Sequence, residues 1–296
     1  MAKKLIFKGI ATALITPLNE NGVDFDKLGK LIDWQIEQGI DGLVICGTTG
    51  EAATMDDKEH LSVLDFAAQR INGRTAMIAG TGSNDTAHAI AMTKEAKKLG
   101  ADAALLVTPY YNKTTQSGLI ASFTATADAV DLPVLLYNVP SRTGVNIEPE
   151  TYAKMADHPN IVGIKEANGN ISKIVETAKL VGDKLAIYSG NDDQIVPMLS
   201  VGAMGCISVL SNVLPKETCE ITKKFFAGDV AGAAQLQFKY LDLINALFSE
   251  VNPIPAKAAM AKMGFCENYL RLPLVPMESA HEVHLIACMK EAGINV

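Results

Sequence analysis

Apolar residues fall into short, nearly continuous runs that alternate with amphipathic segments along most of the chain. Runs of this kind are typical of parallel β-strands whose outer face is covered by helices. The pattern predicts eight strands, at residues 10–16, 42–47, 75–80, 103–109, 134–139, 161–166, 186–190 and 206–210. Segments with helical periodicity follow these strands, among them residues 25–38, 57–70, 85–99 and 172–181.

Eight β-α units in succession predict an α/β fold, a (β/α)8 TIM barrel. The strand pattern stops after Gly228, and residues 229–248, 255–263 and 279–292 are predicted to be helices. We therefore expect a catalytic barrel over residues 1–228 and a C-terminal helical extension over residues 229–296. A doubly wound sheet is the alternative, but it usually has fewer strands, and the Gly-x-Gly-x-x-Gly motif of dinucleotide-binding sheets is missing.

One strand, residues 161–166, carries a lysine, Lys165, within an otherwise apolar run. Desolvation disfavours a charged amine and favours the free amine that a Schiff-base nucleophile requires. A lysine at a strand end can equally extend its ammonium into water, so the strand alone leaves both interpretations open.

Chemically distinctive residues also follow the other strands, where barrel enzymes place their active sites. Residues 47–51, Gly-Thr-Thr-Gly-Glu, form a glycine- and hydroxyl-rich loop that can hold an anion through its N–H groups or be an ordinary tight turn. Tyr137 lies in the strand before that of Lys165, so the two side chains can meet in the barrel mouth, where Tyr137 can transfer protons at an imine or only pack at the rim. Arg142, in the loop after Tyr137, can bind a carboxylate through two hydrogen bonds or form a surface ion pair.

The composition describes a soluble globular protein: 48% of its 296 residues are hydrophobic, 20% are charged, and the net charge is −7. A negative net charge argues against nucleic acid as a partner and gives no support for binding to anionic membranes. The N-terminus lacks the apolar core of a signal peptide, and the five scattered cysteines indicate reduced thiols, so we expect a cytoplasmic protein. His281-Glu-Val-His284 lacks the spacing of the helical zinc motif, and no metal site is predicted.

Three elements together resemble the dihydrodipicolinate synthase/N-acetylneuraminate lyase family of class I aldolase-like barrels. They are residues 47–51, Tyr137 with Asn138 and Pro140, and the stretch Gly163-Ile164-Lys165-Glu166. The resemblance covers essentially the whole chain, including the helical extension. Arg142 is similar to the arginine of the synthase branch, which sialate and sugar-acid lyases typically lack.

The resemblance implies a catalytic role for five residues. Lys165 would form a Schiff base with pyruvate, and Tyr137 would donate and accept protons. Thr49 and Tyr111 would complete a hydroxyl relay with Tyr137, supported by Thr48. In the family, the tyrosine that corresponds to Tyr111 comes from a neighbouring subunit.

Further residues would bind the substrates. Thr48 and Thr49 would help to hold the pyruvate carboxylate, and Arg142 would bind the carboxylate of L-aspartate 4-semialdehyde. Gly190 and Ile207 would line the pyruvate pocket through their backbone carbonyls.

The synthase branch condenses these two small molecules to 4-hydroxy-tetrahydrodipicolinate in the diaminopimelate and lysine pathway, with no metal or organic cofactor. The family also implies a homotetramer, a dimer of dimers. A lyase of the same superfamily that cleaves a 2-keto-3-deoxy sugar acid or an acyl sugar remains an alternative, because one fold hosts several substrates. A catalytically silent protein that senses a metabolite is a third, although such a protein should have lost part of the set Lys165, Tyr137 and Thr49.

Many members of the synthase branch are inhibited by lysine at the tight dimer interface. Three residues match the lysine-sensitive pattern, and three depart from it: the matches are His60, Asn84 and Tyr110, and the departures are Ala52, Asp57 and His88. His88 stands where a glutamate is usual, which removes a charge-assisted contact to the α-ammonium group of the inhibitor L-lysine. The pattern therefore predicts weak or absent inhibition by L-lysine.

Overall fold

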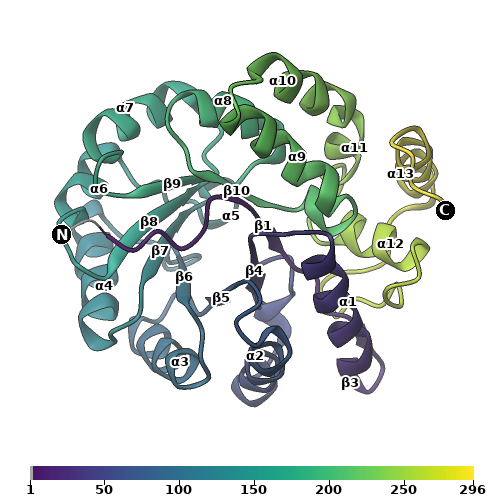
Figure 1. Ribbon diagram of the computed structural model, residues 1–296. Coiled ribbons are helices and arrows are strands. Elements are labelled where there is room, and N and C mark those ends of the chain that lie inside the picture. The colour runs from purple at the N-terminus through teal and green to yellow at the C-terminus, as the bar shows by residue number, and fades with distance from the viewer. Residues whose placement is uncertain (1–2) are drawn as a thin grey trace.

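The computed structural model describes residues 3–296 and contains a closed barrel of eight parallel strands surrounded by helices (Figure 1). Around the barrel the strand order is β1-β10-β9-β8-β7-β6-β5-β4, which returns to β1 and leaves no open edge. The strands are β1 (Gly9–Ala13), β4 (Gly42–Ile45), β5 (Ala76–Gly80), β6 (Ala103–Val107), β7 (Val134–Asn138), β8 (Ile161–Glu166), β9 (Ala186–Ser189) and β10 (Gly205–Ser208). The predicted (β/α)8 barrel is confirmed.

Helices cover the outer face of the barrel, one or more after each strand. The longer ones are α1 (Phe25–Glu37), α2 (Asp57–Ile71), α3 (Thr86–Lys98), α4 (Gln116–Ala129), α6 (Pro149–Met155), α7 (Ile171–Val181), α8 (Ile195–Ser200) and α9 (Pro215–Phe226). Short helical turns lie at the carboxyl ends of strands: η1 (Ala52–Thr54), α5 (Pro140–Thr143), η2 (Asp192–Gln194) and η3 (Leu210–Asn212). Several outer helices begin where a polar side chain accepts a first-turn N–H group, as the capping preferences of these residues require. The capping residues are Asp24, Asp56, Asp85, Thr115 and Asn170.

The predicted strands match the observed ones, but several predicted strands run too far toward the carboxyl end. Residues 14–16, 46–47, 108–109 and 209–210 are loop or turn, because the chain leaves the barrel there to build the rim. A small antiparallel hairpin of β2 (Leu18–Asn19) and β3 (Gly22–Val23) was not predicted, since strands of two residues leave no periodicity to detect.

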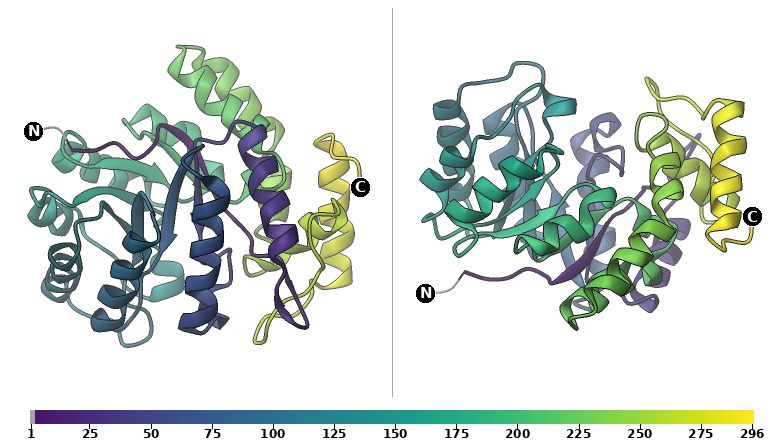
Figure 2. Two further views of the ribbon diagram at one scale, coloured as in Figure 1. Left: turned by 60° about the horizontal axis from the view of Figure 1, so that its bottom comes forward. Right: turned by 90° about the horizontal axis from the view of Figure 1, so that it is seen from above.

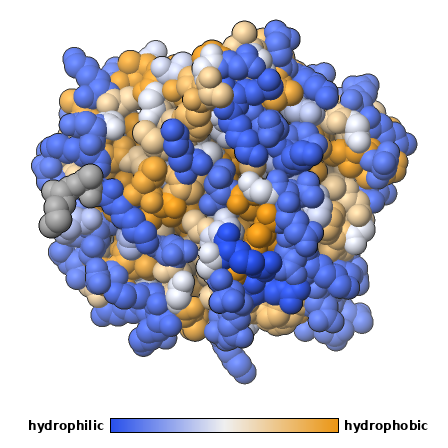
Figure 3. All heavy atoms as spheres, viewed as in Figure 1, coloured by the Kyte–Doolittle hydropathy of each residue, from blue (hydrophilic) through white to orange (hydrophobic). Residues whose placement is uncertain are grey.

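The amino-terminal end of the barrel is closed by the segment that precedes β1, which runs across the front of the barrel in Figure 1. Phe7 stacks on Tyr188 with ring centroids 4.2 Å apart, and the Tyr188 hydroxyl donates to the Phe7 carbonyl at 2.8 Å. On the face that carries this segment, hydrophilic residues surround smaller apolar areas (Figure 3). The barrel is therefore filled from this end, and its cavity opens at the carboxyl ends of the strands.

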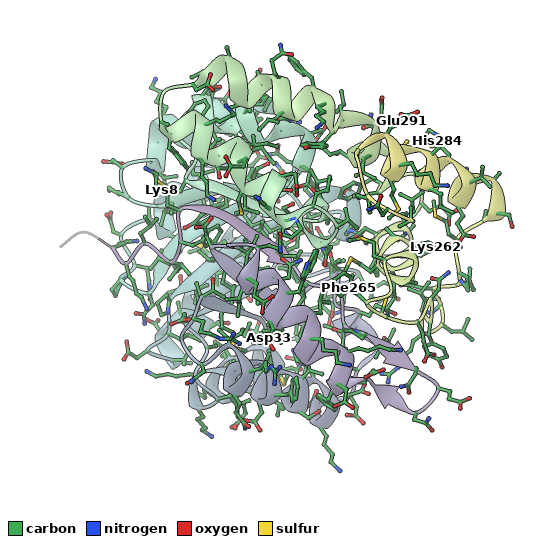
Figure 4. All side chains as sticks on the ribbon, turned by 45° about the vertical axis from the view of Figure 1, so that its right-hand side comes forward. Lys8, Asp33, Lys262, Phe265, His284 and Glu291 are labelled. Carbon is green, nitrogen blue, oxygen red and sulfur yellow. The ribbon has the colours of Figure 1, made fainter. Side chains whose placement is uncertain are left out.

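The C-terminal extension consists of α10 (Val230–Lys239), α11 (Leu241–Ala246), α12 (Ile254–Lys262) and α13 (Ser279–Glu291). The prediction of one helix over residues 229–248 is wrong: the backbone departs from helical geometry at Tyr240 (φ −101°, ψ 4°), whose side chain is buried. Helices α12 and α13 lie at one side of the barrel near α1 (Figure 2). Phe265, which is labelled in Figure 4, follows α12, and its ring centroid lies 4.4 Å from that of Trp34 in α1.

One hydrophobic cluster runs from Ile10 in β1 to Met289 in α13, so the extension and the barrel share packed side chains. The division into units at residue 228 stays a prediction. No helix within residues 3–296 is long and apolar enough to cross a membrane.

Candidate active site

A cavity of about 620 Å³ lies at the carboxyl ends of the barrel strands. Residues from most of the strand ends line it, together with residues of the C-terminal extension. Six of the predicted site residues are among them: Thr48, Thr49, Tyr137, Arg142, Lys165 and Gly190. Sequence segments more than 140 residues apart thus meet in one hollow, as the barrel topology requires.

Lys165 and Tyr137 face each other inside the cavity. They are register partners on the neighbouring parallel strands β8 and β7, so both side chains point to the barrel interior. Lys165 Nζ lies 4.3 Å from the centre of the Tyr137 ring, and the two residues are only 6% and 7% exposed. No carboxylate of residues 3–296 forms an ion pair with Lys165, in contrast to the buried lysine described below. A buried amine without a carboxylate partner, next to a phenol, is suited to attack a carbonyl carbon.

Gly190 leaves room for the lysine side chain. A Cβ atom at this position would lie 3.2 Å from Lys165 Cε and 2.7 Å from Ala167 Cβ. The second distance is shorter than real Cβ contacts, so any larger residue would displace its neighbours. The glycine after β9 is therefore required by the close approach of Ala167, and it also leaves space beside Lys165.

The two threonines of the loop after β4 differ in their surroundings. Thr48 is exposed in the isolated chain, whereas Thr49 is 2% exposed and its Oγ1 accepts a hydrogen bond from Asn252 Nδ2 at 3.0 Å. The loop is tight: Glu51 has a left-handed backbone (φ 56°), and the Gly50 N–H donates to the Gly47 carbonyl at 3.1 Å. Thr49 is thus fixed in position, while the Thr48 hydroxyl faces the open part of the cavity.

Arg142 lies in the short helix α5, directly after β7. Its guanidinium is exposed, and Nη2 donates to the main-chain carbonyl of Asn252 at 2.9 Å. This single contact fixes one nitrogen and leaves the others at the cavity mouth, where they can bind an anionic group.

A buried ion pair anchors the threonine loop to the C-terminal extension. Lys257 of α12 pairs with Glu51, and both side chains are fully buried. The main-chain N–H of Arg271 also donates to Glu51 Oε2, at 3.2 Å. Burial lowers the pKa of Lys257, and the carboxylate of Glu51 partly offsets this effect. Glu51 belongs to the loop that was identified from the sequence, whereas Lys257 was not predicted to contact it.

A second polar network lies on the other face of β8. Strand alternation turns Glu166 away from the cavity, and its carboxylate accepts from Asn138 Nδ2 at 2.9 Å and from the Tyr152 hydroxyl at 3.0 Å. Burial raises the pKa of Glu166 to about 7, although these hydrogen bonds favour the ionised form. The network fixes the outer side of the strand that carries Lys165.

Two predicted residues do not line the cavity. Tyr111 is 92% exposed, and its backbone is left-handed (φ 69°), which is costly for a bulky residue. Paired hydrogen bonds hold its loop: Asn84 Nδ2 donates to the Tyr110 carbonyl at 3.2 Å, and Asn112 Nδ2 to the Asn84 carbonyl at 2.8 Å. The structure therefore holds Tyr111 on a fixed loop with its side chain in solvent.

Ile207 lies in β10, and its side chain is fully buried among the apolar residues of the barrel interior. The expectation that its carbonyl reaches pyruvate stays a prediction.

The cavity also extends beyond the predicted catalytic residues to the amino-terminal turns of α2 and α3. Asp57, His60 and His88 line this part, and His88 Nε2 lies 2.9 Å from Asp57 Oδ1. Two of the three residues that depart from the lysine-sensitive pattern, Asp57 and His88, therefore bind each other.

Comparisons with known proteins agree with this geometry. A model of the dihydrodipicolinate synthetase family matches residues 6–292. A relative from Caldicellulosiruptor saccharolyticus, named 4-hydroxy-tetrahydrodipicolinate synthase, is 53% identical over 292 residues, which cover 98% of this chain and 99% of the relative. The crystal structure of dihydrodipicolinate synthase from Aquifex aeolicus superposes with a TM-score of 0.96 at 43% identity, over 97% of this chain and 99% of that one. A monomeric dihydrodipicolinate synthase variant superposes with a TM-score of 0.96 at 41% identity, over 98% of each chain. The chain belongs to the dihydrodipicolinate synthetase family.

Proposed function

We propose that this chain condenses pyruvate with L-aspartate 4-semialdehyde to give 4-hydroxy-tetrahydrodipicolinate, in the diaminopimelate route to lysine. The observation that carries the proposal is the buried Lys165 amine against the Tyr137 ring at the closed end of a cavity. The extensive identity to relatives named as synthases of this product supports the choice of substrates.

The chemistry is that of a class I aldolase. The Lys165 amine adds to the pyruvate ketone, and loss of water gives a protonated imine. This imine accepts the electrons left when a methyl proton is removed, so that an enamine forms. The enamine carbon attacks the aldehyde of the second substrate, whose amino group then displaces Lys165 and closes the ring. These reaction steps need no metal or organic cofactor.

Tyr137 is suited to move protons during imine formation, because its ring contacts Lys165 Nζ. The relay predicted from the sequence also uses Thr48, Thr49 and Tyr111. Thr48 suits that relay better than Thr49, because its hydroxyl is exposed where a neighbouring subunit could approach. Thr49, whose hydroxyl already accepts from Asn252, suits the binding of the pyruvate carboxylate.

The second substrate is proposed to bind through Arg142, whose guanidinium lies at the mouth of the cavity. Gly190 would offer its carbonyl to pyruvate beside Lys165, and Ile207 would do so from β10. This arrangement places pyruvate deep in the cavity and the semialdehyde carboxylate at the mouth.

The active assembly is proposed to be a homotetramer, a dimer of dimers, in the cytoplasm, where the five free and buried cysteines would stay reduced. The exposed Tyr111 would complete the site of the partner subunit. Because a monomeric variant exists among similar structures, assembly needs its own test.

A complementation experiment tests the assembly. Tyr111→Phe protein and Lys165→Ala protein should each be nearly inactive. After mixed refolding, a hybrid site would contain Lys165 from one chain and Tyr111 from the other, so activity should return in part. A fully active monomer, or no recovery despite mixed assembly, would contradict the proposal.

Borohydride trapping tests the function. Pyruvate with borohydride should inactivate the protein irreversibly, and peptide mass mapping should place the reduced adduct on Lys165. Lys257 is the matched internal control, since it is also buried but is paired with Glu51. A coupled assay should then show turnover of pyruvate with L-aspartate 4-semialdehyde. An adduct on another lysine would refute the nucleophile, and turnover of a sugar acid alone would refute the substrates.

A further inference from the structure

Asn252 lies between α11 and α12, in the C-terminal extension, yet it lines the cavity. Its side-chain Nδ2 donates to Thr49 Oγ1 at 3.0 Å, and its main-chain carbonyl accepts from Arg142 Nη2 at 2.9 Å. One residue thus contacts both groups to which the two substrate carboxylates are assigned.

The side-chain contact has a direction. Because the amide N–H donates, the Thr49 hydroxyl is the acceptor and its own proton remains available for a second partner. A hydroxyl that accepts a hydrogen bond becomes a better donor, because linked hydrogen bonds polarise one another. Thr49 is therefore prepared to donate to an anion in the cavity.

The other end of the amide shows what this arrangement costs. Asn252 is 6% exposed, and its Oδ1 is buried without a hydrogen-bond partner among the described residues. An unsatisfied buried carbonyl is unfavourable, and an apolar side chain at this position would avoid it. The site therefore retains an asparagine for its N–H group and not for its oxygen.

We propose that Asn252 is a positioning residue: its amide orients the Thr49 hydroxyl as a donor to the carboxylate of pyruvate, and its main-chain carbonyl aligns Arg142 for the carboxylate of the semialdehyde. This inference rests on the proposed function. The side chain of Asn252 would act on one substrate and its main chain on the other, so substitution of the side chain should weaken the binding of pyruvate and leave the binding of the semialdehyde unchanged.

The first measurement compares Asn252→Ala with the unaltered enzyme. The KM for pyruvate should rise roughly three- to tenfold, as expected for the loss of one hydrogen-bonding contribution. The KM for the semialdehyde should stay within twofold, because the main-chain carbonyl that holds Arg142 remains. The pyruvate concentration that gives half-maximal borohydride trapping should rise with the KM, because trapping needs no second substrate.

The second measurement reverses the direction of the hydrogen bond. In Asn252→Asp the new carboxylate can only accept hydrogen bonds, so the Thr49 hydroxyl would donate to it instead of to pyruvate. Its negative charge would also repel the pyruvate carboxylate. Half-maximal trapping should then require more than ten times the usual pyruvate concentration. Normal trapping in this variant would overturn the proposed direction of the contact.

A double-mutant cycle separates positioning from general structural support. Thr49→Val removes the hydroxyl at nearly constant shape, and adding Asn252→Ala should then raise the pyruvate KM little further. The matched control is Asn268→Ala, which alters another amide of the extension with a buried, unpaired Oδ1 that does not line the cavity. That control should leave both KM values unchanged.

Additive effects in the cycle, or parallel rises in both KM values, would refute a positioning role. The proposed function fails separately, if pyruvate cannot be trapped on Lys165 in the unaltered protein. Trapping on Lys165 together with unchanged pyruvate binding in Asn252→Ala would remove only the inference about Asn252.

Discussion

The buried ion pair between Glu51 and Lys257 gives a sharp prediction about stability. Lys257→Met keeps most of the side-chain volume but removes the ammonium group, and both members of the pair are fully buried. Glu51 would retain only the N–H of Arg271, at 3.2 Å, as a described partner. Breaking a buried pair on one side leaves an uncompensated charge and typically costs about 3–5 kcal/mol. That is a large fraction of the roughly 5–15 kcal/mol that stabilises a typical protein.

The assay is equilibrium or thermal unfolding of the variants side by side. For a chain of this length, a loss of about 4 kcal/mol corresponds to a fall in the unfolding midpoint of about 6 °C. The double variant Glu51→Gln/Lys257→Met should regain most of this loss, because it removes both charges and keeps an acceptor for Arg271. Activity should follow stability, since Glu51 ends the loop that carries Thr48 and Thr49.

An exposed pair on the same extension is the control. Lys262 lies 3.0 Å from Glu282 with its side chain 44% exposed (Figure 4), and Lys262→Met should have a much smaller effect, because solvent screens such pairs. Equal effects of Lys257→Met and Lys262→Met would show that burial does not set the cost. A double variant as unstable as Lys257→Met would show that the uncompensated charge is not its origin.

Three further predictions concern substrate choice, pH and regulation. Arg142→Ala should lower turnover of the semialdehyde roughly ten- to hundredfold while borohydride still traps pyruvate on Lys165, and a parallel loss of both would indicate a structural role. The pKa of Glu166 rises from 4.5 to about 7 on folding, so its contribution to the free energy of unfolding is complete below pH 4.5 and is lost as the pH rises through 7, by on the order of 3 kcal/mol. In Glu166→Gln the free energy of unfolding should therefore vary less with pH over this range. A pH profile of stability that is the same in this variant would contradict the raised pKa. L-Lysine should inhibit weakly or not at all because Asp57 and His88 bind each other, and strong inhibition at sub-millimolar lysine in a steady-state assay would overturn this expectation.

The barrel could be predicted because each strand carries its own signal. Parallel strands covered on both faces need continuous apolar runs, and these runs are visible without knowledge of their partners. The ends of the strands were less predictable, since apolar loop residues such as Leu14 and Val209 are buried as deeply as the strands they follow. The break at Tyr240 is likewise set by how the helices of the extension pack, and not by the local sequence.

The residues that complete the site from the C-terminal extension could not be found in this way. Asn252 meets Thr49 across 203 residues of sequence, and Lys257 meets Glu51 across 206. Asn252 and Lys257 lie in no motif, and only the folded chain brings them to the loop that carries Thr49 and Glu51. The contact proposed for Tyr111 is harder still to predict from the sequence, because it lies in another subunit and depends on quaternary structure.

The two buried lysines, Lys165 and Lys257, show why the sequence alone does not identify the nucleophile. Lys165 lies within an apolar run of the sequence, and Lys257 lies in a helix whose residues 254–260 are all buried. Both lysines are therefore surrounded by residues that fold into the interior. What separates them is their surroundings: Lys257 is paired with the buried carboxylate of Glu51, whereas Lys165 faces the Tyr137 ring inside a cavity. Burial can be predicted from a pattern of residues, but a paired carboxylate and an adjoining cavity depend on three-dimensional proximity. Only Lys165 of the two lies where the carbonyl group of a substrate could reach its amine.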